Sequence, residues 1–166
     1  MRRRAHRSGG RVRRAVPSPR RAAGTAPART WDVLAVIGLG GGIGSVARHL
    51  AGAAIPAHPY GFPWATFLVN VTGCLAIGGL MAVVDALPGR RYLRPFTGVG
   101  LLGGYTTFST YANELVTLVH HGAWAVAGGY ALGSILAGLA AVRLGKDAAG
   151  AAIRRAAHRR RRGGAP

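Results

Sequence analysis

Four long apolar runs dominate the pattern of hydrophobic and polar positions along the chain. They cover residues 31–54, 62–84, 95–119 and 123–142. Each run is close to the roughly 20 residues that a helix needs to cross a bilayer. A soluble four-helix bundle would instead show amphipathic stripes with a polar outer face, and residues 35–46 and 71–84 have no such face. The pattern predicts an all-α integral membrane protein with four transmembrane helices.

Small residues spaced by four positions recur inside these runs. Lipid tails are as apolar as leucine, so helices in a membrane associate where small side chains let their backbones approach closely. We therefore expect the spaced pairs to form contact faces between helices. The pairs are Gly38/Gly42, Gly40/Gly44, Gly100/Gly104, Gly129/Gly133 and Ser134/Gly138.

Composition adds two basic tails to this apolar centre. The chain holds 22 Lys and Arg against 4 Asp and Glu, and most of the resulting formal charge of +18 lies before Trp31 or from Arg143 onward. We divide it into a basic disordered tail at 1–30, a transmembrane domain at 31–145 and a basic tail at 146–166, the last with only a short helix near 148–157. Such tails favour contact with anionic lipid, and nucleic acid is the less favoured partner.

The arginines also predict the orientation of the chain. With four spans, both tails and the loop between the second and third spans share one side, and that loop carries Arg90, Arg91 and Arg94. The two loops of the opposite side, near 57–61 and 120–122, contain histidines but no Lys or Arg. By the positive-inside rule, we expect both termini to be cytoplasmic.

Polar residues inside the runs indicate a path through the protein. The third run contains Gly-Gly-Tyr-Thr-Thr-Phe-Ser-Thr-Tyr at 103–111, followed by Glu114. A helix this rich in glycine and hydroxyl groups is expected to break at its centre and to free backbone carbonyls. Two further pairs lie one helical turn apart, Thr66 with Asn70 and Tyr130 with Ser134. Because polar groups in a membrane need a partner or water, we interpret the whole set as a polar track.

Three motifs on consecutive runs agree in order and spacing with one family. Residues 40–48 read G-G-x-x-G-x-x-x-R, Asn70 lies in L-V-N-V-T-G, and residues 103–111 look like G-G-x-T-T-F-S-T-F. Together they resemble the CrcB/Fluc family of fluoride channels over residues 33–145, with the tails outside the match.

The resemblance implies an antiparallel dimer with two fluoride pores and a central structural sodium ion. It assigns the backbone carbonyls of Gly103 and Thr106 to sodium, and the amide of Asn70 and the ring edge of Phe108 to fluoride. The family usually has phenylalanine where this chain has Tyr111, so the phenol either keeps the edge contact, donates a hydrogen bond or alters conduction. Arg48 is expected at a vestibule that attracts anions. The remaining positions of the track are Thr66, Ser109, Thr110, Glu114, Tyr130 and Ser134.

Some of these side chains also have ordinary structural interpretations. A threonine in a membrane helix often bonds a carbonyl of its own helix, which is the alternative for Thr72 and Thr110. Arg48 would then only snorkel to the interface, and Glu114 would be paired near a helix end. Cys74, the one cysteine, is expected to pack as a small apolar side chain.

The function predicted is a fluoride-specific channel that exports fluoride passively, and not an enzyme, because no catalytic constellation is present. The alternative is a small multidrug-type proton-coupled transporter, which would need an acid within its first span where this chain has glycine and alanine. A fixed orientation cannot supply both halves of an antiparallel dimer. We therefore expect an oppositely oriented homologue as partner, the rival being a homodimer whose subunits insert both ways.

Overall fold

The computed structural model describes residues 28–163, with the exception of residues 57 and 88. Its elements are α1 (Ala28–Ala53), α2 (Trp64–Ala86), η1 (Arg94–Leu102), α3 (Gly103–Tyr105), α4 (Phe108–His120) and α5 (Trp124–Gly163). The predicted all-α class is confirmed for the described part of the chain. The N-terminal tail predicted at 1–30 lies almost entirely outside the described residues.

Three helices of the described chain are long and apolar enough to cross a membrane. They are Thr30–Ala53, Trp64–Ala86 and Trp124–Arg160. The run 95–119, predicted as a third continuous span, is instead divided among η1, α3 and α4. The predicted central break is therefore present, at Thr106 and Thr107, while the count of four spans stays a prediction.

The first part of the divided segment, η1, is a nine-residue π-helix that begins at Arg94 with Pro95 in its first turn. Nothing in the sequence pattern distinguished it from an α-helix. π-Helical turns are rare and occur mostly at functional sites. Here the three residues of α3 separate the π-helix from the break.

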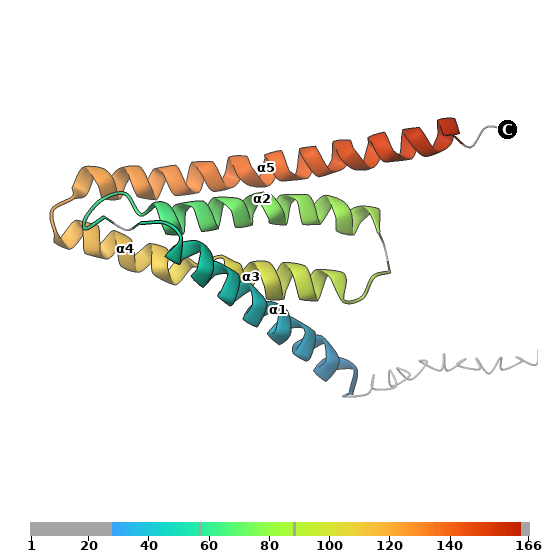
Figure 1. Ribbon diagram of the computed structural model, residues 1–166, viewed down its shortest axis with the longest axis horizontal. Helices are drawn as coiled ribbons and strands as arrows, with labels where there is room; N and C mark the ends of the chain where they lie inside the picture. The colour runs from blue at the N-terminus through green and yellow to red at the C-terminus, as the bar shows by residue number, and fades with distance from the viewer. Residues whose placement is uncertain (1–27, 57, 88, 164–166) are drawn as a thin grey trace, which may run out of the picture.

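The helices form a bundle with the chain reversals at its two ends (Figure 1). α5 and α2 run side by side, and η1, α3 and α4 lie along the other side of α2, crossed by α1. At one end, Asp32 near the start of α1 accepts hydrogen bonds from Arg91 Nη2 (2.9 Å) and the Tyr92 hydroxyl (2.7 Å). The beginning of α1 and the turn between α2 and η1 therefore lie together, as the predicted topology requires.

Glycines make the closest contacts of the bundle. A Cβ on Gly44 would overlap the Leu101 carbonyl oxygen, and one on Gly100 would lie 2.6 Å from the Ile37 carbonyl oxygen. Only glycine therefore fits where α1 meets η1, which confirms the contact faces predicted for Gly40/Gly44 and Gly100/Gly104. Gly138 also faces a neighbour, because a Cβ there would lie 3.4 Å from Cys74 Sγ.

Two of the predicted glycine pairs have no contact within the described chain. A Cβ on Gly38, Gly42, Gly129 or Gly133 would meet no atom within 4 Å. The close contact between α2 and α5 lies elsewhere, at Gly78 and Gly145, where a Cβ would overlap a backbone carbonyl of the facing helix. The spacing rule finds small residues, but it does not say which of them face another helix.

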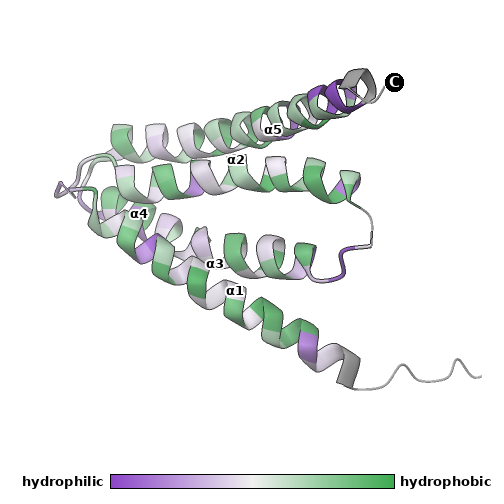
Figure 2. Ribbon diagram, turned by 45° about the vertical axis from the view of Figure 1, so that its right-hand side comes forward, coloured by the Kyte–Doolittle hydropathy of each residue, from purple (hydrophilic) through white to green (hydrophobic). Residues whose placement is uncertain are grey.

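The helix predicted near 148–157 is longer than expected, because α5 continues through residues 146–163 as part of one helix of 40 residues. The physical reason is local. Residues 146–157 are rich in alanine, the strongest helix former, and contain no proline. Gly145 also packs tightly against α2 rather than ending the helix. The hydrophilic end of α5 in Figure 2 is therefore a continuation of the helix beyond the apolar bundle.

Candidate functional site

The break between α3 and α4 is the centre of the candidate site. Thr106 (φ −80°, ψ 158°) and Thr107 (φ −146°, ψ 124°) have extended backbone between two helical segments. Thr107 is the N-cap of α4, where its hydroxyl oxygen accepts the Thr110 N–H at 3.2 Å. The same hydroxyl donates to the Thr110 side chain at 2.9 Å. An N-cap threonine supplies an acceptor to an unpaired helix N–H, so this cap fixes where α4 begins.

Asn70 of α2 holds the break from the side. Its Nδ2 donates to the Thr107 carbonyl at 2.9 Å, and its Oδ1 accepts the Thr107 N–H at 2.8 Å. In a continuous helix that N–H would bond the Gly103 carbonyl. Asn70 therefore replaces the missing helical hydrogen bonds and releases the Gly103 carbonyl from its helical partner.

Two side chains of α1 approach the neighbouring carbonyls of the break. The Ser45 hydroxyl donates to the Gly104 carbonyl at 3.5 Å, and Arg48 Nη1 donates to the Thr106 carbonyl at 3.3 Å. Irregular backbone at membrane depth must be satisfied by protein or by a water-filled cavity. The positions of Ser45 and Arg48 meet part of that requirement.

Glu114 of α4 is held by hydroxyl groups from two other helices. Thr66 donates to its Oε1 at 2.8 Å and Tyr130 donates to its Oε2 at 2.7 Å. Tyr130 is fully buried, and its ring packs against Phe62 (5.3 Å between centroids) and Tyr111 (5.0 Å). An ionisable group in a membrane is costly unless it is partnered, and these two hydroxyls are the partners of Glu114.

Two cavities lie on either side of α2 at the level of the break. One, of about 420 Å³, lies between α2, the broken segment and α5, and its lining includes Asn70, Gly103, Thr106, Phe108 and Ser134. The other, of about 410 Å³, lies between α1, α2 and α4. Thr107 contacts both. The Ser134 hydroxyl oxygen is buried and has no hydrogen-bond partner among the described residues.

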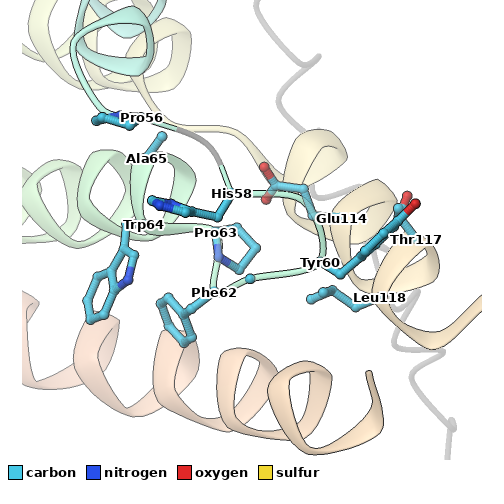
Figure 3. A pocket seen from close by; sticks show the side chains of 11 residues that line it. Pro56, His58, Tyr60, Phe62, Pro63, Trp64, Ala65, Glu114, Thr117 and Leu118 are labelled. Carbon is cyan, nitrogen blue, oxygen red and sulfur yellow. The ribbon is translucent and has the colours of Figure 1, made fainter. Parts of the chain in front are cut away.

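A third cavity, of about 200 Å³, reaches Glu114 from the end of the bundle that contains the loop before α2. Figure 3 shows Glu114 and Thr117 of α4 on one side of it and the segment with His58, Tyr60 and Phe62 on the other. The Tyr60 ring stacks on His121 at 4.1 Å between centroids. Glu114 is thus the point where the polar track meets this end of the bundle.

The structure brings most of the predicted residues together but leaves the roles assigned to them as predictions. Asn70, Thr106, Thr110 and Ser109 gather around Thr107, and the Ser109 hydroxyl is 3.4 Å from the Thr107 hydroxyl. Thr66, Glu114 and Tyr130 form a second group, described above. Phe108 is 79% exposed, and its only ring neighbour among the described residues is Tyr111, at 5.9 Å.

The structure also gives hydrogen-bond partners for the side chains that had alternative interpretations. Thr72 bonds the Leu68 carbonyl of its own helix at 2.7 Å, as its structural interpretation expected. Thr110 instead receives its hydrogen bond from Thr107. The Tyr111 hydroxyl donates to the Ala131 carbonyl at 3.3 Å, so this phenol is directed to the backbone of α5. Arg48 points to the break rather than only to the interface.

Thr107 and Ser45 are the polar residues that the sequence interpretation missed. Thr107 lies inside the quoted motif, and a threonine just before a helical run is a recognisable N-cap signal. Ser45 bonds a carbonyl on an element 59 positions away, and no local pattern indicates such a contact. Among the described residues, no cluster of three or more His, Cys, Asp or Glu could hold a metal ion.

Comparison with known proteins gives consistent matches across the transmembrane part of the chain. Residues 35–146 match the family described as CrcB-like protein, Camphor Resistance (CrcB). A fluoride-specific ion channel FluC 2 of Nocardia farcinica (strain IFM 10152) is 53% identical over 130 residues, which are 75% of this chain and 93% of that protein.

Two further relatives bear related names. A fluoride-specific ion channel FluC 1 of Streptomyces coelicolor (strain ATCC BAA-471 / A3(2) / M145) is 45% identical over 75% of this chain and 84% of its own length. A fluoride-specific ion channel FluC of Paracoccus denitrificans (strain Pd 1222) is 47% identical over 66% of this chain and 87% of its own length.

Proposed function

Because the chain belongs to the CrcB family, we propose that it is a fluoride-specific ion channel that lowers cytoplasmic fluoride by passive export. The observation that carries the proposal is the helix break that Asn70 holds open beside a polar track. A proton-coupled transporter would need a carboxylate deep in α1. The one acid of α1 is Asp32, at its beginning, where it is paired with Arg91.

The donors around the break suit a small anion that holds its water tightly. A passage for such an ion must replace hydration with several weak contacts and still release it. Asn70 uses one of its two amide hydrogens for the Thr107 carbonyl, which leaves the other for an anion. The unpartnered hydroxyl of Ser134 and the positive ring edge of Phe108 line the same cavity. None of these three groups has a full positive charge that would trap the ion.

The sodium ion expected at the centre of the family's dimer fits the donors of this chain in part. Neutral carbonyl oxygens are hard ligands that suit such a cation, and the Gly103 carbonyl has lost its helical partner. The Thr106 carbonyl already accepts a hydrogen bond from Arg48, but a carbonyl oxygen has a second lone pair. We propose that these two carbonyls hold the sodium ion, which would neutralise the dipoles that converge on the break, and that a second subunit completes its coordination.

Pairing with a second subunit is part of the same proposal. Phe108 lines the cavity of about 420 Å³ and is nevertheless 79% exposed, so one chain leaves this side of the path uncovered. We propose an antiparallel dimer in which residues 94–120 provide a fourth crossing of the membrane. Its partner is an oppositely oriented homologue, or a second copy if the chain inserts both ways.

The basic groups support an orientation with both termini in the cytoplasm. Arg143 and Lys146 of α5 lie beside the last turns of α2, since a Cβ on Gly78 would lie 3.0 Å from Lys146 N. Arg94 begins η1 at the same end of the bundle. These side chains can reach the headgroup region from helix ends. We propose that they contact anionic lipid and hold this end on the cytoplasmic side.

Fluoride efflux from liposomes tests the proposed function. The chain is reconstituted alone and together with an oppositely oriented homologue, and efflux is followed with a fluoride electrode, with chloride efflux as the control. We expect fluoride-selective flux. Flux that requires the homologue supports a heterodimer, and flux from the chain alone supports dual insertion. The absence of selective flux in both preparations would contradict the proposed function.

A further inference from the structure

The cavity between α1, α2 and α4 is lined by groups that can donate hydrogen bonds or carry positive charge. Its volume is about 410 Å³. Its polar lining consists of Ser45, Arg48, His49, Thr66, Thr107 and Thr110. The hydroxyls of Ser45, Thr66 and Thr107 already donate to protein groups. The Thr110 hydroxyl, which accepts from Thr107, and the remaining N–H groups of Arg48 can still serve an anion as donors. This lining is therefore chemically suited to a hydrated anion on its way to the break.

The described residues that line this cavity include basic side chains but no acidic ones. Arg48 supplies a permanent positive charge, and among the described residues that line the cavity there is no carboxylate. The nearest acid is Glu114 of α4, which is reached through Thr66 and held by Thr66 and Tyr130. Glu114 lines the separate cavity of about 200 Å³ instead. In the cavity of about 410 Å³, an anion is thus attracted by Arg48, and no carboxylate of the lining repels it.

His49 is the other titratable group of this lining. It follows Arg48 near the end of α1 and is exposed. The other histidines and the carboxyl group at this end of the bundle lie outside the cavity. His58 and Glu114 line the smaller one, His121 stacks on Tyr60, and His120 lines neither cavity. Histidine is the side chain whose charge ordinarily changes between pH 5 and 8.

We infer that His49 is a second anion-attracting side chain of this vestibule and that its protonation makes fluoride entry faster as the surrounding solution becomes acidic. The inference rests on the proposed channel function and adds a regulation to it. Consider a unit positive charge about 8 Å from an anion, in a medium whose effective dielectric constant is about 40 to 80. This charge raises the occupancy of the cavity by the anion about two- to fivefold. Fluoride entry at low concentration should change by the same factor.

The test measures initial fluoride efflux from proteoliposomes at pH 7.5 and pH 5.5, at low fluoride, after subtraction of the leak of protein-free liposomes. The wild-type rate should rise about two- to fivefold at the lower pH. His49→Gln, which cannot be protonated, should have a low rate at both pH values. His49→Lys, which stays charged, should have the high rate at both. His120→Gln changes a histidine at the same end that does not line the cavity, and should keep the wild-type response.

The outcomes separate this inference from the proposed function. Wild-type flux that is selective but equal at both pH values would overturn the role of His49 and leave the channel function intact. A pH response that survives in His49→Gln would overturn it as well. If no variant conducts fluoride at either pH, both the inference and the proposed function are wrong. Because His49 is exposed, the two substitutions are expected to leave the fold unchanged.

Discussion

Replacement of Asn70 by alanine should both destabilise the protein and stop fluoride flux. The side chain makes two hydrogen bonds, of 2.9 and 2.8 Å, to the carbonyl and N–H of Thr107. Asn70→Ala leaves both backbone groups unpaired at membrane depth. An unsatisfied buried group costs about 1–3 kcal/mol, and single hydrogen bonds measured in membrane proteins average about 0.6 kcal/mol, with a maximum of about 1.7. For two hydrogen bonds we therefore expect a loss of about 1–3 kcal/mol in the free energy of unfolding.

The matched control is Asn113→Ala. Asn113 is an exposed asparagine of α4 whose side chain has no hydrogen bond among the described residues. The same change of residue type there should alter the free energy of unfolding by less than about 0.5 kcal/mol. Unfolding of the purified variants is followed by circular dichroism during titration from a mild detergent into a denaturing one. Fluoride efflux is measured on the same preparations.

The two measurements distinguish a structural from a conducting role of Asn70. Asn70→Asp keeps an acceptor for the Thr107 N–H but loses the donor and adds a negative charge. It should therefore stop flux even where it restores part of the stability. The reasoning is refuted if Asn70→Ala unfolds with the same free energy as Asn113→Ala, because the two hydrogen bonds then contribute nothing to holding the break.

Three further predictions follow from the contacts described above. Gly44→Ala places a methyl group against a backbone carbonyl of η1, so it should lower the yield of folded protein and cost at least about 2 kcal/mol. Gly128→Ala meets no atom within 4 Å and should be neutral in the same unfolding titration. Tyr130→Phe removes one of the two hydroxyls on Glu114 and should reduce efflux at least about tenfold with a smaller loss of stability. Tyr111→Phe removes only a 3.3 Å bond to a carbonyl and should keep most of the flux, so equal losses in the two tyrosine variants would contradict the place of Tyr130 and Glu114 on the polar track. A tag on either terminus of the chain expressed alone should be accessible only from the cytoplasmic side; equal labelling on both sides would contradict a fixed orientation.

Much of the fold could be predicted, because a run of about 20 mostly apolar residues is enough to indicate a membrane helix. The helices α1, α2 and α5 follow from that rule, and the glycine-rich, hydroxyl-rich segment around Thr106 indicated the break. The π-helix could not be predicted, because nothing in the pattern of residues 94–102 distinguishes it from an α-helix. The length of α5 was wrong because charge was given more weight than the helix propensity of alanine.

The candidate site was predictable where it lies within one motif and less so where it depends on contacts between helices. Asn70 was identified as a polar residue that must have a partner, and the hydrogen bonds to the backbone of Thr107 are a partner that the sequence did not indicate. Likewise, Glu114 was seen as a costly charge, while its two hydroxyl donors became clear only from the packing. Sequence patterns indicate which residues need partners, and the fold decides which partners they find.

The same physical requirement supports the second subunit that we propose. Asn70, Arg48 and Ser45 satisfy carbonyls of the break from the sides of α1 and α2. A Cβ on Gly103 would meet no atom within 4 Å, and the Phe108 ring is largely exposed. Lipid cannot satisfy the released Gly103 carbonyl, because hydrocarbon offers no hydrogen-bond donor. The second subunit and the cation that we propose would supply polar partners to this face.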